Sequence, residues 1–260
     1  MSLLDVTGIT LTFRGLAALM NVSFTIEEGE ILSLIGPNGA GKTSMLNCIS
    51  GRYHPDEGDI AIDGKSILSM KAHRRTEMGL SRTFQNIALF KGMSVLDNLM
   101  VGRHSQMKYG LLASMLYWGK ARRHEDMHRR RVEDVIDFLG LSPYRHQVAG
   151  RLPYGVQKRV ELGRALAAEP RLILLDEPMA GMNLEETEDM ARYILDINEE
   201  WGVTVLLVEH DMGVVMDISD KVVVLDFGSV LATGAPEEVQ QDKDVIAAYL
   251  GGEDETFLGR

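Results

Sequence analysis

A short glycine-rich loop near the start of the chain has the residue types that bind a polyphosphate. An apolar run over residues 31–35 precedes it, and the run that begins at Ser44 predicts a helix. Glycines let the backbone turn so that its N–H groups face inward, and the helix directs its positive end toward the same point. The loop comprises Gly36, Pro37, Asn38, Gly39, Ala40, Gly41, Lys42 and Thr43. We predict that the loop and Ser44 bind a nucleotide, with Lys42 on the β- and γ-phosphates and the Thr43 hydroxyl on Mg²⁺.

Two adjacent carboxylates close a second apolar run. Residues 172–175 are apolar, and Asp176 and Glu177 follow them directly. We expect Asp176 to hold Mg²⁺ through a water and Glu177 to polarise the water that attacks the γ-phosphate. The alternative is an acidic turn that closes a core strand, and the glycine-rich loop upstream favours the catalytic interpretation. A third apolar run ends before Glu209, and His210 could reach the γ-phosphate or be an ordinary surface residue.

Hydrophobic patterning predicts the elements that carry these groups. Apolar and polar residues alternate in three early segments, which is typical of a half-exposed antiparallel sheet. Later runs rich in Leu and Val instead predict parallel strands that are covered on both faces. The alternating segments are 9–13, 22–26 and 60–62, and the later apolar runs are 172–175, 203–208 and 222–225.

A helical segment interrupts this sheet core, because residues 95–160 are dense in Leu, Met, Arg and Glu. The predicted fold class is α/β, a P-loop NTPase core with an antiparallel β subdomain and an inserted α-helical subdomain. We expect one domain over residues 1–260. Its expected parts are 1–94 (β subdomain and loop region), 95–160 (helical subdomain), 161–235 (the rest of the core) and 236–260 (a helical tail).

The composition predicts a globular cytoplasmic protein. The 260 residues are 45% hydrophobic, carry a net charge of −11 and include one cysteine, Cys48. Nucleic-acid partners usually need a basic surface, so we expect none. The N-terminus lacks a secretory signal pattern and no run of about eighteen apolar residues occurs, which predicts a chain that is neither secreted nor membrane-spanning. We expect Cys48 to be a small buried residue rather than a reactive thiol.

Together, these motifs resemble the ATPase subunits of ABC transporters over nearly the whole chain. The glycine-rich loop matches the Walker A motif, and Leu172–Asp176 matches the Walker B strand. The resemblance implies that Glu177 is the catalytic glutamate and His210 the switch histidine. It also implies that Gln85 is the Q-loop glutamine, with a part in catalysis and in Mg²⁺ binding, and that Phe13 stacks on adenine. The implied cofactors are ATP and Mg²⁺.

The segment that corresponds to the signature of this family, usually Leu-Ser-Gly-Gly-Gln, departs from the common pattern. It comprises Leu152, Pro153, Tyr154, Gly155 and Val156. The resemblance implies that this segment contacts ATP bound by the opposite subunit, and Pro153 has neither the serine hydroxyl nor an N–H for that contact. Asn183 likewise stands where an aspartate is common. We therefore expect weaker closure over one nucleotide, and a heterodimer with a second ABC ATPase subunit.

A narrower resemblance is to the first of two ATPases in branched-chain amino acid importers. The segments that carry it are 81–86, 154–155, 180–183, 209–212 and 245–251. It implies import of branched-chain or related hydrophobic amino acids, with two multi-span membrane permease subunits and, indirectly, a periplasmic substrate-binding protein. The chain is then expected on the inner face of the cell membrane, with the permease docked near residues 85–90 and the helical insert.

Two other functions are weighed against this one. An ATPase of lipopolysaccharide export has a similar tail, but normally keeps the serine-containing signature and has a shorter helical insert. A soluble ABC-type ATPase that acts on DNA or ribosomes tends to carry a long coiled-coil insert or a second cassette. This chain shows neither of those features.

Two signals in the helical insert have ordinary explanations. Residues 124–128 fit the H-E-x-x-H pattern of zinc proteases, but the arginines at 129–131 favour a solvated helix with i,i+4 ion pairs, so we expect no zinc. Residues 109–118 are strongly apolar yet too short to span a bilayer. They predict a buried helix, with contact to the permease or the membrane as the alternative.

Overall fold

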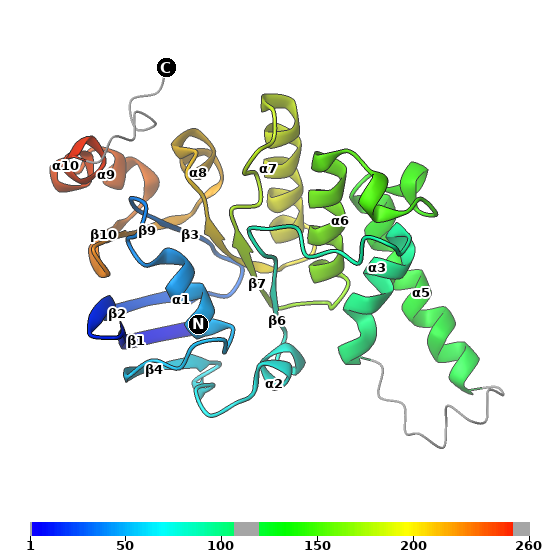
Figure 1. Cartoon of the computed structure of the whole chain (residues 1–260), viewed down its shortest axis with the longest axis horizontal. Coiled ribbons are helices and arrows are strands. Elements are labelled where there is room, and N and C mark those ends of the chain that lie inside the picture. The colour runs from blue at the N-terminus through cyan, green and yellow to red at the C-terminus, as the bar shows by residue number, and fades with distance from the viewer. Residues whose placement is uncertain (1, 107–119, 252–260) are drawn as a thin grey trace.

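The computed structural model describes residues 2–106 and 120–251, which form two sheets with helices packed around them (Figure 1). The strands are β1 (Ser2–Phe13), β2 (Leu16–Glu27), β3 (Ile31–Ile35), β4 (Glu57–Ile62), β5 (Lys65–Ser66), β6 (Leu80–Arg82), β7 (Leu172–Asp176), β8 (Thr204–Val208), β9 (Lys221–Asp226) and β10 (Ser229–Gly234). The α-helices are α1 (Lys42–Ile49), α2 (Ala72–Glu77), α3 (Val95–Gly102), α5 (Lys120–Phe138), α6 (Tyr154–Leu166), α7 (Leu184–Glu199), α8 (Met212–Ile218), α9 (Pro236–Gln240) and α10 (Lys243–Gly251).

A four-stranded antiparallel sheet with the order β2-β1-β4-β5 is formed by the early strands. In β2, Val22, Phe24 and Ile26 are buried while the residues between them are exposed. Side chains alternate between the two faces of a strand, so only one face of this sheet is covered. The predicted half-exposed antiparallel sheet is confirmed.

The central sheet has six strands in the order β10-β9-β3-β8-β7-β6. Its five strands from β9 to β6 are parallel, and only β10 at the edge runs antiparallel. Every residue of β3, β7 and β8 is buried, as the continuous apolar runs predict. In a sheet of this kind ligands bind beyond the carboxyl ends of the strands. The glycine-rich loop after β3 and the two carboxylates at the end of β7 both lie at that edge.

Two hydrophobic cores cover the two faces of the central sheet. On one face Leu174 and Leu206 pack with the antiparallel sheet and α1. On the other face Leu175 and Leu207 pack with helices of the insert and with α7. The antiparallel sheet and α1 are therefore held together as one layer, which fixes the position of the glycine-rich loop.

Helices α3, α5 and α6 of the insert lie together beyond β6 (Figure 1). The segment between α5 and α6 forms turns and two short 3₁₀ helices, Ser142–Tyr144 and Ala149–Arg151, so the predicted helical segment is interrupted. Gly140 with φ 62° ends α5, and proline at 143 and 153 prevents a regular helix from continuing. The apolar segment 109–118 lies outside the described residues. Within the described residues, no helix has the length and apolar character needed to cross a membrane.

Cys48 on α1 is fully buried, as predicted, and burial raises the pKa of its thiol to about 11. At pH 8 only about 0.1% of such a thiol is the reactive thiolate, against roughly a quarter for an unperturbed cysteine. We expect a thiol reagent such as dithionitrobenzoate to leave the native protein unmodified and to modify one thiol after denaturation. Rapid modification of the native protein at pH 8 would contradict this assignment.

Candidate active site

The glycine-rich loop is held tightly between β2 and β9. Gly36 has φ 144°, and a Cβ there would lie 2.0 Å from the Leu225 carbonyl oxygen. Gly41 has φ 107°, and a Cβ there would lie 2.7 Å from the Ala18 carbonyl oxygen. Any side chain at these two positions would collide with backbone, so glycine is required by both conformation and space.

Lys42 begins α1 and points back into the loop. Its ammonium donates to the carbonyl oxygens of Gly36 at 2.5 Å and Pro37 at 3.0 Å, and its side chain is buried. Thr43 in the first turn of α1 is exposed, and Ser44 is half-buried. The Lys42 ammonium and the N-terminus of α1 together favour binding of a polyphosphate in this loop. The phosphate oxygens can replace the loop carbonyls as hydrogen-bond acceptors of the ammonium.

Asp176 ends β7 in a buried position. Its Oδ2 pairs with the Arg82 guanidinium at 2.9 Å, and its Oδ1 is buried with no hydrogen-bond partner among the described residues. A buried carboxylate oxygen normally has a partner, since desolvation without one is costly. An oxygen left in this state fits a site for Mg²⁺ or a water bound to it, which prefer carboxylate and hydroxyl oxygens.

Glu177, the next residue, contacts both Gln85 and His210. The sequence predicted these three residues separately, but not their contacts with one another. Its Oε1 lies 2.7 Å from His210 Nε2, and its Oε2 accepts from Gln85 Nε2 at 2.6 Å. These residues come from the ends of β7, β8 and the segment after β6, which are neighbours in the central sheet. Glu177 has a left-handed backbone, φ 49°, which is uncommon outside glycine and is found at functional sites. The geometry gives one carboxylate two polar neighbours that hold it in place.

Glu209 supports this cluster and was not predicted as a site residue. It is buried, and it accepts from the backbone N–H of Met179 at 2.8 Å and of His210 at 3.1 Å. Burial raises the pKa of Glu209, while these two hydrogen bonds oppose the rise. The contacts tie the loop after Glu177 to the loop that carries His210.

Lys158 on α6 is a second residue that sequence reasoning missed. It is buried, and its ammonium donates to the backbone carbonyls of Gln85 at 3.0 Å and Glu177 at 3.2 Å. Burial lowers the pKa of Lys158, and the carboxylates of Glu161 and Glu209 oppose that effect. The sequence carries no signal for this role, because a lysine two residues from Val156 and from Val160 is expected on the opposite, solvated face of a helix. Lys158 joins the helical insert to the two predicted catalytic segments.

Replacing Lys158 with methionine is expected to lower the turnover number for ATP by about tenfold, because the backbone carbonyls of two predicted catalytic residues lose a charged donor. The Kd for ATP should stay unchanged, since the acceptors of the Lys158 ammonium are the Gln85 and Glu177 carbonyls and lie outside the glycine-rich loop. Arg159→Met is the matched control, because Arg159 on the same helix donates to the Leu139 carbonyl instead. Equal effects of the two substitutions on turnover would remove Lys158 from this role.

The signature segment is not brought to the chain's own glycine-rich loop. Figure 1 shows α6 and α1 on opposite sides of β6 and β7. Leu152 is buried, and Pro153 immediately precedes α6. The segment is instead joined to the loop before α7, because the Tyr154 hydroxyl donates to the Ala180 carbonyl at 3.0 Å.

Two contacts fix how α6 meets the N-terminus of α7. A Cβ at Gly155 would lie 2.3 Å from Glu186 Oε1, so a larger residue there would displace the Glu186 side chain. Glu186 in turn forms a capping box with Asn183, in which each side chain accepts from the other residue's backbone N–H. Asn183 therefore has a local structural role at the position where an aspartate is common.

Phe13 lies at the end of β1 and is 43% exposed. Its ring meets Tyr53 edge to face, with ring centroids 5.1 Å apart. Tyr53 follows α1, so the pair stands near the helix that begins in the glycine-rich loop. The exposed face of one aromatic ring can stack on a base, and Tyr53 is a further candidate for this contact.

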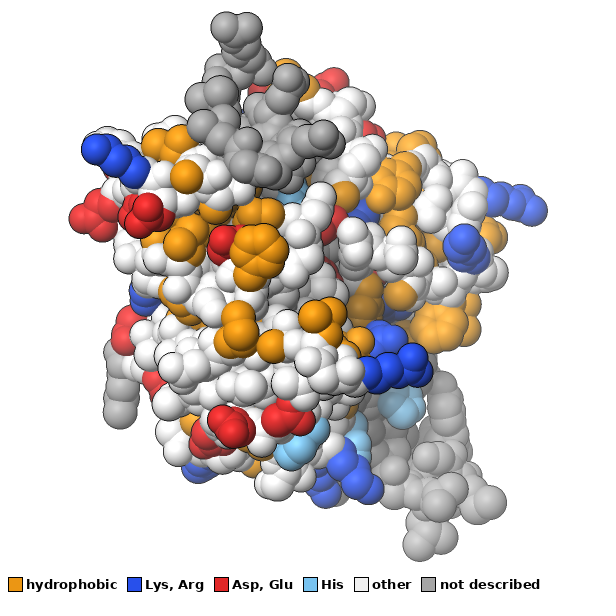
Figure 2. Space-filling view, turned by 60° about the vertical axis from the view of Figure 1, so that its left-hand side comes forward, with side chains coloured by type: hydrophobic (Ala, Val, Ile, Leu, Met, Phe, Trp, Pro, Cys, Tyr) orange, Lys and Arg blue, Asp and Glu red, His pale blue; other side chains and the backbone are white. Residues whose placement is uncertain are grey.

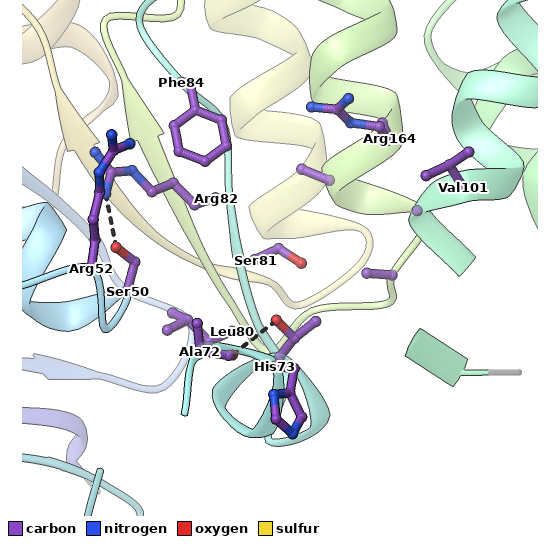
Figure 3. Close-up of a pocket in the computed structure, with 14 residues that line it drawn as sticks. Ser50, Arg52, Ala72, His73, Leu80, Ser81, Arg82, Phe84, Val101 and Arg164 are labelled. Atoms are coloured by element: carbon purple, nitrogen blue, oxygen red, sulfur yellow. Dashed lines mark hydrogen bonds between the residues drawn. The ribbon is translucent and has the colours of Figure 1, made fainter. Parts of the chain in front are cut away.

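A cleft of about 550 Å³ opens on the insert side of β6 (Figure 3). Its walls come from α2, β6, α3 and α6, and they include Arg82, Phe84, Val101 and Arg164. Phe84 lines this cleft, whereas none of residues 85–90, the predicted docking segment, is among its lining residues. The cleft adjoins the Asp176 site through Arg82.

The residues that fit the zinc-protease pattern, 124–128, lie on α5. Met127 and Arg129 are exposed, whereas His128 is buried and its Nδ1 lies 3.0 Å from a guanidinium nitrogen of Arg103. His128 therefore packs against α3 and its continuation, contrary to a fully solvated helix. His124 and Glu125 of the zinc-protease pattern are not among the side chains that the structure describes, and among those that it does describe no group of three or more His, Cys, Asp and Glu is arranged to hold a metal ion.

The sequence matches two family models. A model described as ABC transporter matches residues 19–180. A model described as branched-chain amino acid ATP-binding cassette transporter matches residues 229–255.

Individual proteins resemble the chain over nearly their full lengths. The high-affinity branched-chain amino acid transport ATP-binding protein BraF of Pseudomonas aeruginosa is 42% identical over 249 residues, which cover 96% of this chain and 98% of that protein. The lipopolysaccharide export system ATP-binding protein LptB of Haemophilus influenzae is 32% identical over 251 residues, with 96% and 98% coverage. A crystal structure of a nucleotide-free ATP-binding cassette from an ABC transporter superposes with a TM-score of 0.83 at 31% identity, covering 96% of this chain and 99% of that one.

Proposed function

The chain belongs to the ABC transporter family of ATPases, and from this premise we propose that it powers an importer for branched-chain or related hydrophobic amino acids. The observation that carries the substrate class is the likeness to BraF, at 42% identity over nearly both chains. The match of residues 229–255 to the branched-chain cassette model supports the same class. The lower identity to LptB, 32%, makes lipopolysaccharide export the weaker alternative.

The cluster around Glu177 supports a mechanism in which this carboxylate accepts a proton from the attacking water. Gln85 and His210 hold its two oxygens, so the carboxylate is oriented before the substrate arrives. In this proposal Lys42 binds the β- and γ-phosphates, His210 contacts the γ-phosphate and Phe13 contacts adenine. Thr43, Gln85 and Asp176 are the residues that would hold Mg²⁺, which would offset the charge of the phosphates.

We propose a heterodimer with a second ABC ATPase, in which each signature segment covers the partner's nucleotide. The separation of α6 from α1 supports a site completed by another subunit (Figure 1). Pro153 supports unequal sites, because proline offers neither a hydroxyl nor an N–H to a phosphate. Gly155 and the N-terminus of α6 remain as anion-binding elements.

The cleft shown in Figure 3 is the proposed docking site for a cytoplasmic helix of a multi-span permease. Exposed Phe84 and Val101 offer apolar contacts, and Arg52 and Arg164 lie among the same lining residues. The proposed location is therefore the inner face of the cell membrane, with a periplasmic binding protein as an indirect partner.

A soluble ATPase acting on nucleic acid is disfavoured by charge. The chain carries a net charge of −11, and on the face in Figure 2 Lys and Arg side chains are scattered rather than gathered in one patch. Binding to a polyanion relies on a concentrated basic surface.

The test is to tag the chain in its native cell, solubilise membranes gently and identify the copurifying proteins by mass spectrometry. A second ATPase, two permeases and a periplasmic binding protein are expected, and that binding protein should bind a branched-chain amino acid in calorimetry. Recovery of lipid-export components would support the alternative transporter. Recovery of ribosomal or chromatin proteins without a permease would contradict the proposed transport function.

A further inference from the structure

Arg82 connects the cleft to the predicted metal site. It ends β6, lines the cleft, and has a side chain only 7% exposed. Its guanidinium donates to Asn47 Oδ1 and Ser50 Oγ, both at 2.8 Å, and pairs with Asp176 Oδ2 at 2.9 Å. One side chain therefore joins the C-terminal part of α1 to the carboxylate at the end of β7.

The same guanidinium also touches the wall of the cleft. Its central carbon lies 5.2 Å from the centroid of the Phe84 ring, a cation–π distance. Figure 3 shows Arg82 directed toward Ser50, with the Phe84 ring on the cleft side. Phe84 is 37% exposed, so an occupant of the cleft can reach it. Because the two groups are in contact, we expect a displacement of the guanidinium to displace the Phe84 ring, and a displacement of the ring to displace the guanidinium.

The charges at Asp176 make this connection sensitive to a bound cation. One carboxylate oxygen is neutralised by Arg82 and the other, buried Oδ1, has no partner among the described residues. A divalent cation near Oδ1 would compete with Arg82 for the same negative charge and would repel the guanidinium. Arg82 thus weakens cation binding at Asp176, and cation binding weakens the ion pair.

We propose that Arg82 is a positioning residue that couples occupancy of the divalent-metal site at Asp176 to the position of Phe84 in the cleft wall. The coupling is reciprocal, so an occupant that moves Phe84 changes the metal affinity by the same factor. The inference rests on the proposed ATP hydrolysis at this site, and it is independent of which permease or substrate the transporter uses.

The first experiment measures metal affinity on the isolated full chain. Mn²⁺ is titrated by electron paramagnetic resonance in the presence of a non-hydrolysable ATP analogue. Arg82→Gln is expected to bind Mn²⁺ about five- to tenfold more tightly, because a cation beside the carboxylate is removed. Arg82→Lys keeps the charge and should stay within about twofold of the wild type. Arg52→Gln is the matched control, since Arg52 lines the same cleft but is not the ion-pair partner of Asp176.

The second experiment reports on the cleft wall without using activity. In Phe84→Trp, adding Mg²⁺ to the analogue-bound protein should change the fluorescence of the new tryptophan, after subtraction of the parent signal. The change should disappear in Phe84→Trp combined with Arg82→Lys, because lysine lacks the planar group that spans Phe84 and Asp176. It should persist in the combination with Arg52→Gln. Arg82→Lys also keeps the test decisive if Arg82→Gln fails to fold.

Three outcomes would overturn the coupling. These are an unchanged Mn²⁺ affinity in folded Arg82→Gln, an equal affinity shift in Arg52→Gln, or a tryptophan response that survives Arg82→Lys. Asp176→Asn separates this inference from the proposed function. Full Mn²⁺ affinity in that variant would remove Asp176 from the metal site, whereas lost affinity with no effect of Arg82 would reject the coupling alone.

Discussion

Replacing Glu177 with glutamine is expected to lower the turnover number for ATP by at least about 10²-fold, the usual scale for loss of a general base. The amide cannot accept a proton from water, but it has the same shape as the carboxylate. It can still hydrogen-bond to Gln85 and His210, which lie 2.6 and 2.7 Å from the carboxylate oxygens. ATP should therefore bind with near-normal affinity, which calorimetry with the variant would measure alongside steady-state turnover.

Glu185→Gln is the matched control for this substitution. Glu185 is an exposed carboxylate in the first turn of α7, and its replacement removes the same charge without touching the cluster. Near-normal turnover in Glu177→Gln would exclude Glu177 as the base. A loss of ATP binding equal to the loss of turnover would instead indicate that the cluster holds the nucleotide rather than the attacking water.

Replacing Lys42 with methionine is expected to weaken ATP binding by about 10- to 100-fold, because a charged hydrogen bond to phosphate contributes roughly 1.5–3 kcal/mol. Methionine keeps most of the apolar stem of this buried side chain, so packing against the loop changes little. The ammonium that donates to the Gly36 and Pro37 carbonyls is lost. Titration with a fluorescent ATP analogue measures the affinity, and a thermal melt without nucleotide measures any effect on the loop itself.

Lys65→Met controls for the change in net charge, since Lys65 is exposed on β5. It should bind ATP as the wild type does. Unchanged affinity in Lys42→Met would place the phosphates elsewhere. Weak binding accompanied by a much lower melting temperature would show that Lys42 acts by holding the empty loop together.

The fold class could be predicted because each element carries its own pattern. Alternation in β1 and β2 reflects one covered face, and the unbroken apolar runs of β3, β7 and β8 reflect two. Strand β6 was not predicted, because three residues are too few for a period to emerge. The order of the parallel strands was not predicted either, because buried strands of similar apolar composition do not specify which strands they pair with.

The sequence by itself determined the local chemistry: the glycine-rich loop with Lys42 and Thr43, and the adjacent carboxylates Asp176 and Glu177. Residues that are neighbours along the chain are placed together by backbone geometry alone. Only the tertiary structure decided the long-range partners, such as Arg82 with Asp176, which are 94 residues apart. Lys158 was likewise assigned its role only by the packing of α6 against the ends of two other segments. The physical reason is that such contacts depend on strand order and helix packing. Many residues determine these together, so no short sequence motif predicts them.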